Sequence, residues 1–107
     1  MKKLVIVGVG GFGREVAWLV ERINSVKPTW ELLGFIDDNV ETHGKVINGY
    51  PVLGGCDWVL EHRTETYVIC AVGASKTRKR IVSKLTGAMF TTLVDPTVEM
   101  SSRVKMG

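Results

Sequence analysis

Short apolar runs alternate with segments of helical periodicity along most of this chain. The run over residues 4–7 is continuously apolar and mostly β-branched, which is typical of a parallel strand covered on both faces. The next apolar residues recur at helical spacing and predict a helix over 11–26. Lys27-Pro28 ends it, because proline disfavours helical geometry in the residue before it. The apolar face of this helix consists of Val16, Leu19, Val20 and Ile23.

The rest of the pattern predicts three more strands and two more helices. We expect strands at 32–36, 67–72 and 91–94, helices at 56–62 and 75–85, an extended piece at 51–54 and a polar loop over 39–50. Strands that alternate with helices imply a parallel sheet with helices on both faces. With right-handed crossovers this is a Rossmann-like α/β fold, in which ligands bind at the carboxyl ends of the strands.

Composition limits the classes of function. The chain has 107 residues, the size of one ordinary domain, and a net charge of +3 spread along its length. This charge favours an anionic ligand but, without interleaved aromatic residues, not a nucleic acid. No segment approaches the ~20 apolar residues of a membrane span, so we expect a cytoplasmic protein. Cys56 and Cys70 do not pair with His43 or His62 at metal-ligand spacing, and we expect no bound metal.

A glycine-rich turn follows the first predicted strand. Gly8, Gly10 and Gly13 satisfy the pattern GxGxxG, and Gly11 adds a fourth glycine. Without side chains, the backbone N–H groups at the start of a helix can approach a pyrophosphate closely. The turn therefore predicts a nucleotide site, the alternative being a tight turn that only packs helix on strand. Arg14, in the first helical turn, either pairs with a phosphate or is solvated.

Two acidic residues, Asp37 and Asp38, follow the second predicted strand. In dinucleotide enzymes an acid at this position accepts hydrogen bonds from a ribose hydroxyl. We expect one of the two to bind ligand and the other to cap the loop that follows. Neighbours on an extended chain point to opposite faces, so we do not expect them to act as an acid–base pair.

Gly73 follows the third predicted strand and would again let the backbone approach a ligand. The helix after it is crowded with basic residues, mainly a solvated face, with Arg78 the best candidate for a ligand contact near the crevice. These residues are Lys76, Arg78, Lys79 and Arg80. The sequence contains no Ser-His-Asp set and no cysteine with a nearby histidine, so nothing in it looks like a nucleophile with its base.

The last residues show a different period. Val98 and Val104 are six residues apart, with the small Ser101 and Ser102 between them. A hexapeptide period with a β-branched residue at each turn is typical of a left-handed parallel β-helix, which needs about three repeats to bury its core. We therefore expect a Rossmann-like domain over 1–95 and the beginning of a β-helix domain over 96–107, whose remainder would lie beyond this chain.

Five stretches together resemble the N-terminal domain of the bacterial sugar O-acyltransferase family. This family is related to the sialic acid O-acetyltransferases and includes UDP-amino-sugar N-acetyltransferases of bacillosamine and perosamine synthesis. The stretches are VIVGVGGFGREV, LLGFIDDN, GYPVLGG, ICAVGASKTRKRI and TLVDPTVEMSSRV, and they span essentially the whole chain. One departure is Asp95-Pro96, where the family commonly has His-Pro.

The resemblance implies a domain that binds a UDP-linked sugar, within a longer homotrimeric protein whose β-helix binds acetyl-CoA and carries a histidine general base. Such a protein transfers an acetyl group from acetyl-CoA to an amine or a hydroxyl of a sugar, and the resemblance does not distinguish the two. The 107-residue chain alone would be a monomer or weak dimer and would catalyse nothing. The candidate contacts to the sugar nucleotide are Gly8, Gly10, Gly11, Phe12, Gly13, Arg14, Asp37, Asp38, Gly73 and Arg78.

Two other functions fit the glycine-rich turn and Asp37 taken alone. One is an NAD(H)-binding Rossmann module of an oxidoreductase or redox sensor, against which stand the short chain and the hexapeptide tail. The other is a non-enzymatic nucleotide-sensing domain. It would be favoured if no β-helix followed Gly107 in the full gene.

Overall fold

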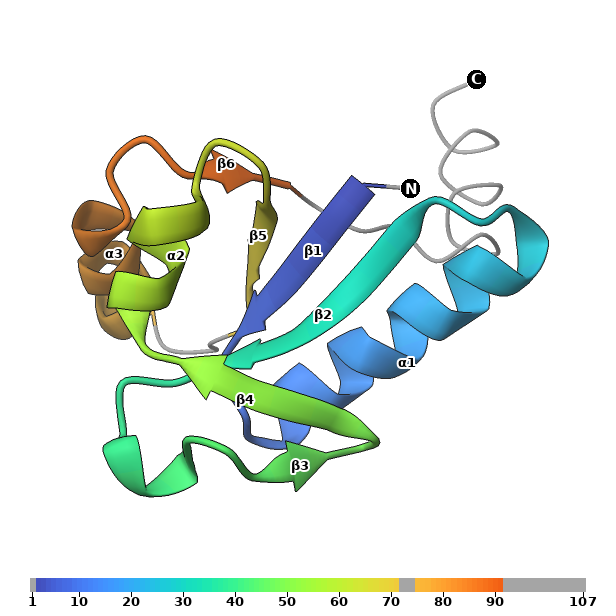
Figure 1. Cartoon of the computed structure of the whole chain (residues 1–107), viewed down its shortest axis with the longest axis horizontal. Helices are drawn as coiled ribbons and strands as arrows, with labels where there is room; N and C mark the ends of the chain where they lie inside the picture. Colours follow the sequence, from blue (N-terminus) through green and yellow to red (C-terminus); the bar gives the residue numbers. More distant parts are fainter. Residues whose placement is uncertain (1, 72–74, 92–107) are drawn as a thin grey trace.

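Strands and helices alternate as the sequence predicts, and they build a six-stranded sheet with helices on both faces (Figure 1). The computed structural model describes residues 2–71 and 75–91. The strands are β1 (Lys2–Val7), β2 (Trp30–Ile36), β3 (Val46–Ile47), β4 (Tyr50–Gly54), β5 (Tyr67–Cys70) and β6 (Met89–Phe90). The helices are α1 (Gly11–Val26), the 3-10 helix η1 (Val40–Thr42), α2 (Cys56–His62) and α3 (Ser75–Lys84).

The strands lie in the order β3-β4-β2-β1-β5-β6. β1 pairs in parallel with β2 and β5, β2 with β4, and β5 with β6, whereas β3 is antiparallel to β4. Within the described residues, the expected parallel Rossmann-like sheet is therefore confirmed for every strand except β3. β1 lies inside the sheet, so its carboxyl end is flanked by the ends of β2 and β5.

The apolar run of β1 supplies the centre of both core layers. Val5 and Val7 pack with α2 and α3 on one face, and Ile6 packs with α1 on the other. Leu4 joins Val20 and Trp30 in a third cluster on the α1 side. Because alternate side chains of a strand point to opposite faces, a strand covered on both sides must be apolar throughout.

The connection from α1 to β2 is held by one side chain. Lys27 is extended, with φ −146°, as expected for the residue before Pro28. The side-chain oxygen of Asn24 accepts hydrogen bonds from the backbone N–H groups of Thr29 and Trp30, each at 3.0 Å, and its amide donates to the carbonyl of Trp30 at 2.8 Å. Asn24 thereby fixes where β2 begins after the helix has ended.

The segment 39–50 is not entirely loop, as the sequence analysis expected. It contains η1 and β3, and β3 forms a hairpin with β4. The two-residue turn is Asn48-Gly49, with φ angles of 51° and 84°. Asn-Gly is the preferred pair for a turn in which both residues have positive φ, so this dipeptide was the signal for the hairpin.

Three other predictions concern the ends of elements. The helix expected over 75–85 ends at Lys84, and the last described strand is β6 at Met89–Phe90, ahead of the predicted 91–94. Residues 92–94, Gly73 and the predicted β-helix start at 96–107 lie outside the described residues.

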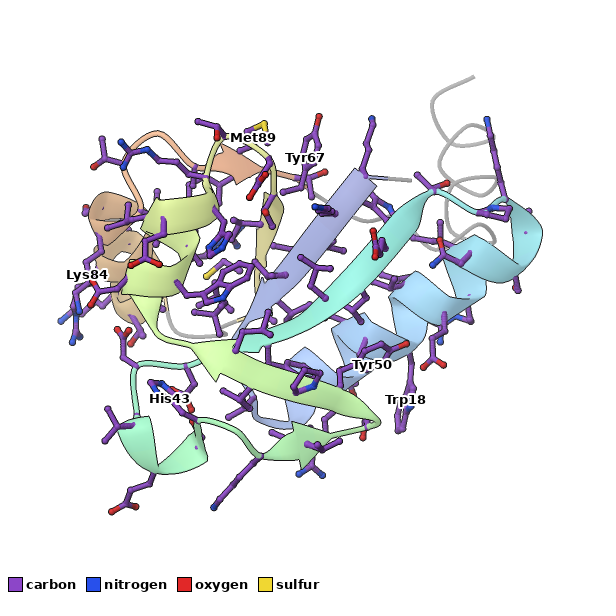
Figure 2. The ribbon with its side chains drawn as sticks, viewed as in Figure 1. Trp18, His43, Tyr50, Tyr67, Lys84 and Met89 are labelled. Atoms are coloured by element: carbon purple, nitrogen blue, oxygen red, sulfur yellow. The ribbon has the colours of Figure 1, made fainter. Side chains whose placement is uncertain are left out.

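The described helices include none that is both long and apolar enough to cross a membrane. Trp18 is 54% exposed on the outer side of α1, away from the sheet (Figure 2). It lies one position off the apolar stripe of that helix, where Val16, Ala17 and Val20 are buried.

Candidate functional site

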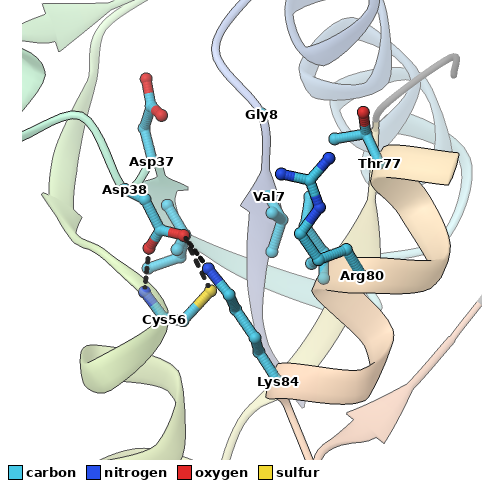
Figure 3. A pocket seen from close by; sticks show the side chains of 10 residues that line it. Val7, Gly8, Asp37, Asp38, Cys56, Thr77, Arg80 and Lys84 are labelled. Carbon is cyan, nitrogen blue, oxygen red and sulfur yellow. Dashed lines mark hydrogen bonds and ion pairs between the residues drawn. The ribbon is translucent and has the colours of Figure 1, made fainter.

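A pocket of about 240 Å³ opens at the carboxyl ends of β1 and β2, beside α3 (Figure 3). The neighbouring strands β1 and β5 are followed by α1 and α3, and these two helices pack on opposite faces of the sheet (Figure 1). The pocket lies near the point where the chain thus leaves the sheet in two directions. Ligands bind at such switch points in open α/β sheets. The lining residues are Val7, Gly8, Ile36, Asp37, Asp38, Cys56, Thr77, Arg80, Ile81 and Lys84.

The glycines of the turn after β1 are of two kinds. Gly8 has φ 114°, which favours glycine. A Cβ on Gly13 would overlap the carbonyl oxygen of Gly8, so glycine is required there for α1 to approach β1. Gly10 and Gly11 differ, because a Cβ on either would meet no atom within 4 Å and neither has a positive φ. Backbone conformation accounts for Gly8 and packing for Gly13, but neither explains Gly10 and Gly11.

The N-terminus of α1 is uncapped by side chains. Its N-cap residue is Gly10, and its first turn contains no acidic residue. The N–H of Arg14 donates to the carbonyl of Gly10 at 3.1 Å, so the N–H groups of 11–13 precede the first intrahelical bond. The partial positive charge of a helix N-terminus attracts anions. Arg14 is exposed in the same turn and does not line the pocket.

Asp38 caps a helix that begins far from it in the sequence. Its Oδ1 accepts the backbone N–H of Cys56 at 2.8 Å, at the start of α2. Its Oδ2 lies 3.5 Å from both the Cys56 Sγ and the Lys84 Nζ (Figure 3). A Cβ on Gly55 would lie 2.8 Å from Oδ1, so glycine leaves the carboxylate its room. The hydrogen bonds from the backbone N–H and then the thiol of Cys56, followed by Lys84, hold the pKa of Asp38 below its usual value against the opposing effect of burial.

Replacing Asp38 with alanine should lower the free energy of unfolding by about 1 kcal/mol at pH 7, because an N–H of α2 loses its acceptor. Since folding lowers the pKa of Asp38, this contribution is complete above the ordinary carboxyl pKa of about 4 and is lost as the pH falls through the lower folded value. Urea unfolding of both proteins from pH 7 down to about pH 2 measures the difference. The exposed Glu65→Ala is the control, and a difference that did not shrink in acid would contradict the assignment.

Asp37 points the other way from Asp38 (Figure 3). Its carboxylate accepts the N–H of Asn39 at 3.2 Å and the hydroxyl of Thr42 at 3.3 Å. Asp37 thus caps the loop that follows, as expected for one of the two acids. The two carboxylates hold different segments, and nothing in this arrangement makes them an acid–base pair.

Helix α3 presents a different basic residue to the pocket from the one expected. Thr77, Arg80 and Lys84 line it, whereas Arg78 lies on another side of the helix in a shallow depression with Lys79. Ile81 and Leu85 pack into the core between these two sides. The basic residues of this helix do not tell by themselves which of its flanks faces the crevice, and for this reason Arg80 and Lys84 were missed.

In each histidine one ring nitrogen lies at hydrogen-bond distance from a backbone carbonyl, and the buried Cys56 is held as a thiol. His62 Nδ1 lies 2.8 Å from the carbonyl oxygen of Trp58, on whose ring it stacks, and His43 Nε2 lies 2.7 Å from that of Asp37. Burial, then the hydrogen bond to Asp38, raises the pKa of Cys56 to about 11, so it stays a thiol at neutral pH. Within 2–71 and 75–91, no three His, Cys, Asp or Glu residues are placed to hold a metal ion.

Comparison with known proteins adds to this geometry. The family model described as the PglD N-terminal domain matches residues 3–85. No curated protein sequence matches the chain significantly. Among solved structures, the acetyltransferase domain of PglB from Neisseria gonorrhoeae FA1090 is 26% identical with a TM-score of 0.65, and 90% of this chain aligns with 45% of that one. This chain therefore spans less than half the length of that relative.

Two further solved structures resemble this chain. The same PglB domain in complex with acetyl coenzyme A is 26% identical with a TM-score of 0.64, covering 89% of this chain and 44% of that one. RSP in complex with β-NADH is 14% identical with a TM-score of 0.57, covering 99% of this chain and 61% of that one. At that identity the second likeness shows the fold alone.

Proposed function

Since this chain belongs to the PglD N-terminal domain family, we propose that it is the nucleotide-sugar-binding domain of a longer, acetyl-CoA-dependent sugar acetyltransferase. The family match covers every strand of the sheet except β6, all the described helices and the whole lining of the pocket. The likeness to the PglB acetyltransferase domain supports the same function.

The observation that carries the proposal is the open space at Gly10 and Gly11. These glycines stand at the uncapped N-terminus of a long helix, and the fold itself does not require them. A ligand whose phosphates approach the helix backbone does require bare positions there. Gly10, Gly11 and Gly13 are therefore proposed to present backbone N–H groups to a diphosphate, with Arg14 at the same helix end.

The space around Asp38 suits an elongated ligand. The pocket of about 240 Å³ is smaller than the roughly 300–1,000 Å³ of most small-molecule sites. A second hollow of about 490 Å³ adjoins it and shares Asp38, Cys56 and Lys84 with it. Val40 and Leu60 give this second hollow apolar walls. We assign the phosphates to the crevice beside Gly8 and the nucleoside to the side of Asp37 and Asp38.

The finer parts of the proposal concern the whole protein. Its substrate is a UDP-linked amino-sugar or sugar for a bacterial surface glycan, and acetyl-CoA is the co-substrate, bound outside the described residues. The longer protein is a cytoplasmic homotrimer. The 107-residue chain alone is proposed to bind the sugar nucleotide without transferring the acetyl group, since acetyl-CoA would be bound outside the described residues.

Titration of the 107-residue chain with UDP-N-acetylglucosamine and, separately, with NADH tests the proposal by backbone amide NMR. We expect shifts at Gly10, Gly11 and Asp37 with the UDP-sugar and none with NADH. Shifts with NADH alone would favour the dinucleotide module. The likeness of this chain to RSP in complex with β-NADH is at 14% identity and supports only a shared fold.

Replacing Gly11 with alanine should weaken binding of UDP-N-acetylglucosamine by about tenfold, because a methyl group would enter the space through which the phosphates approach. Stability should be unchanged or slightly higher, since alanine favours a helix and its Cβ meets nothing here. Calorimetric titration and urea unfolding measure the two effects. Val26→Ala, at the exposed far end of α1, is the matched control. Unchanged affinity in Gly11→Ala would remove the main support for the phosphate site.

A further inference from the structure

Arg80 stands apart from the other charged groups of the pocket. It lines the pocket from α3, and its guanidinium reaches over it toward the end of β1 (Figure 3). Within the described residues its side chain has no hydrogen bond or ion pair, whereas Lys84 on the same helix is held 3.5 Å from Asp38. An unpaired guanidinium beside a pocket is a ready donor to an anion, with a fork of N–H groups that matches phosphate oxygens.

The position of Arg80 complements that of the glycine-rich turn. Gly8, at the start of the turn, lines the same pocket as Arg80. α1 packs on one face of the sheet and α3 on the other. An anion above the end of β1 would therefore meet the N–H groups of α1 from one side and a guanidinium from the other. The hydroxyl of Thr77, one turn before Arg80, lines the same wall.

We infer that Arg80 binds the diphosphate of the nucleotide sugar, opposite the N-terminus of α1. The inference rests on the proposed function and adds to it a residue of α3 that recognises phosphate. Lys84 has a different role, because its ammonium group is engaged with the carboxylate that caps α2. Arg80 is thus the cation of the pocket that is available to the ligand.

The test compares Arg80→Ala with Lys79→Ala, which removes one positive charge from the other side of the same helix. The ligands are UDP and uridine, titrated into the 107-residue chain and followed by amide NMR. Arg80→Ala should weaken UDP binding at least about tenfold, as expected for a lost charge-assisted hydrogen bond, and leave uridine binding unchanged. Lys79→Ala should bind both as the wild type does. Arg80→Lys should recover part of the UDP affinity, since lysine keeps the charge but not the fork.

Each other result would overturn the inference in a recognisable way. If the wild type bound neither UDP nor UDP-N-acetylglucosamine, the proposed function would fall and this inference with it. If the wild type bound UDP and Arg80→Ala bound it equally well, only the role of Arg80 would be wrong. Equal losses for UDP and uridine would place the contact away from the phosphates. A loss in Arg78→Ala in place of Arg80→Ala would return the role to the residue that the sequence favoured.

Discussion

Replacing Gly13 with alanine should lower the free energy of unfolding by about 3 kcal/mol. The new methyl group would overlap the carbonyl oxygen of Gly8 and lie 3.6 Å from the ring of Phe35. The overlapping atom belongs to the backbone, so relief requires α1 to move away from β1 and to loosen the contacts of Val16 and Ala17. Urea unfolding followed by circular dichroism measures the loss.

Gly11→Ala is the matched control for Gly13→Ala. It makes the same chemical change two residues earlier, where the added Cβ meets no atom within 4 Å. The two variants should therefore separate the two uses of glycine in one turn, with Gly13→Ala losing stability and Gly11→Ala losing affinity. Similar stabilities for both would show that α1 adjusts more easily than the close approach at Gly8 indicates.

Truncating Phe35 to alanine should cost about 3–5 kcal/mol of stability, a large part of the 5–15 kcal/mol typical of a native protein. Phe35 is fully buried in β2, in the cluster that joins α1 to the sheet. Its neighbours belong to different elements and cannot all collapse into the space. The midpoint of urea unfolding and the slope of the transition measure the effect.

Phe90→Ala is the control for Phe35→Ala, because it removes the same side chain from an exposed position. Phe90 lies in β6 and is 41% exposed, so its removal should cost less than about 1 kcal/mol. A comparable loss of unfolding free energy in both variants would mean that Phe90 is buried in the protein. Burial of Phe35 would then not explain a larger loss at that position.

The elements that the sequence predicts best are those whose burial is two-sided or strictly periodic. The strand at 4–7 and the apolar stripe of α1 could be predicted without knowing what they pack against, because each pattern has one structural explanation. The hairpin of β3 was missed because Val46 and Ile47 are too short a run to show alternation. Its signal lay in the turn, Asn48-Gly49, and not in the strand.

The site was predictable as a place but not as a set of side chains. The pattern of strand ends identified Gly8, Asp37 and Asp38, all of which line the pocket. It could not reveal that Asp38 caps α2, because that hydrogen bond joins residues far apart in the sequence. The choice between Arg78 and Arg80 depends on how α3 is rotated against the sheet, which is a property of tertiary packing.

The central position of β1 has a consequence for how the chain reaches its fold. Leu4 pairs with Leu32 on one side and with Tyr67 on the other, so the strand is complete only when segments distant in sequence have returned to it. To form such a parallel pair, the chain must close a large loop and lose conformational entropy before the contacts between the strands form. This requirement slows folding. Until β5 arrives, one edge of the most apolar strand stays open to other chains. Folding speed and freedom from aggregation therefore depend on the same late pairing between β1 and β5.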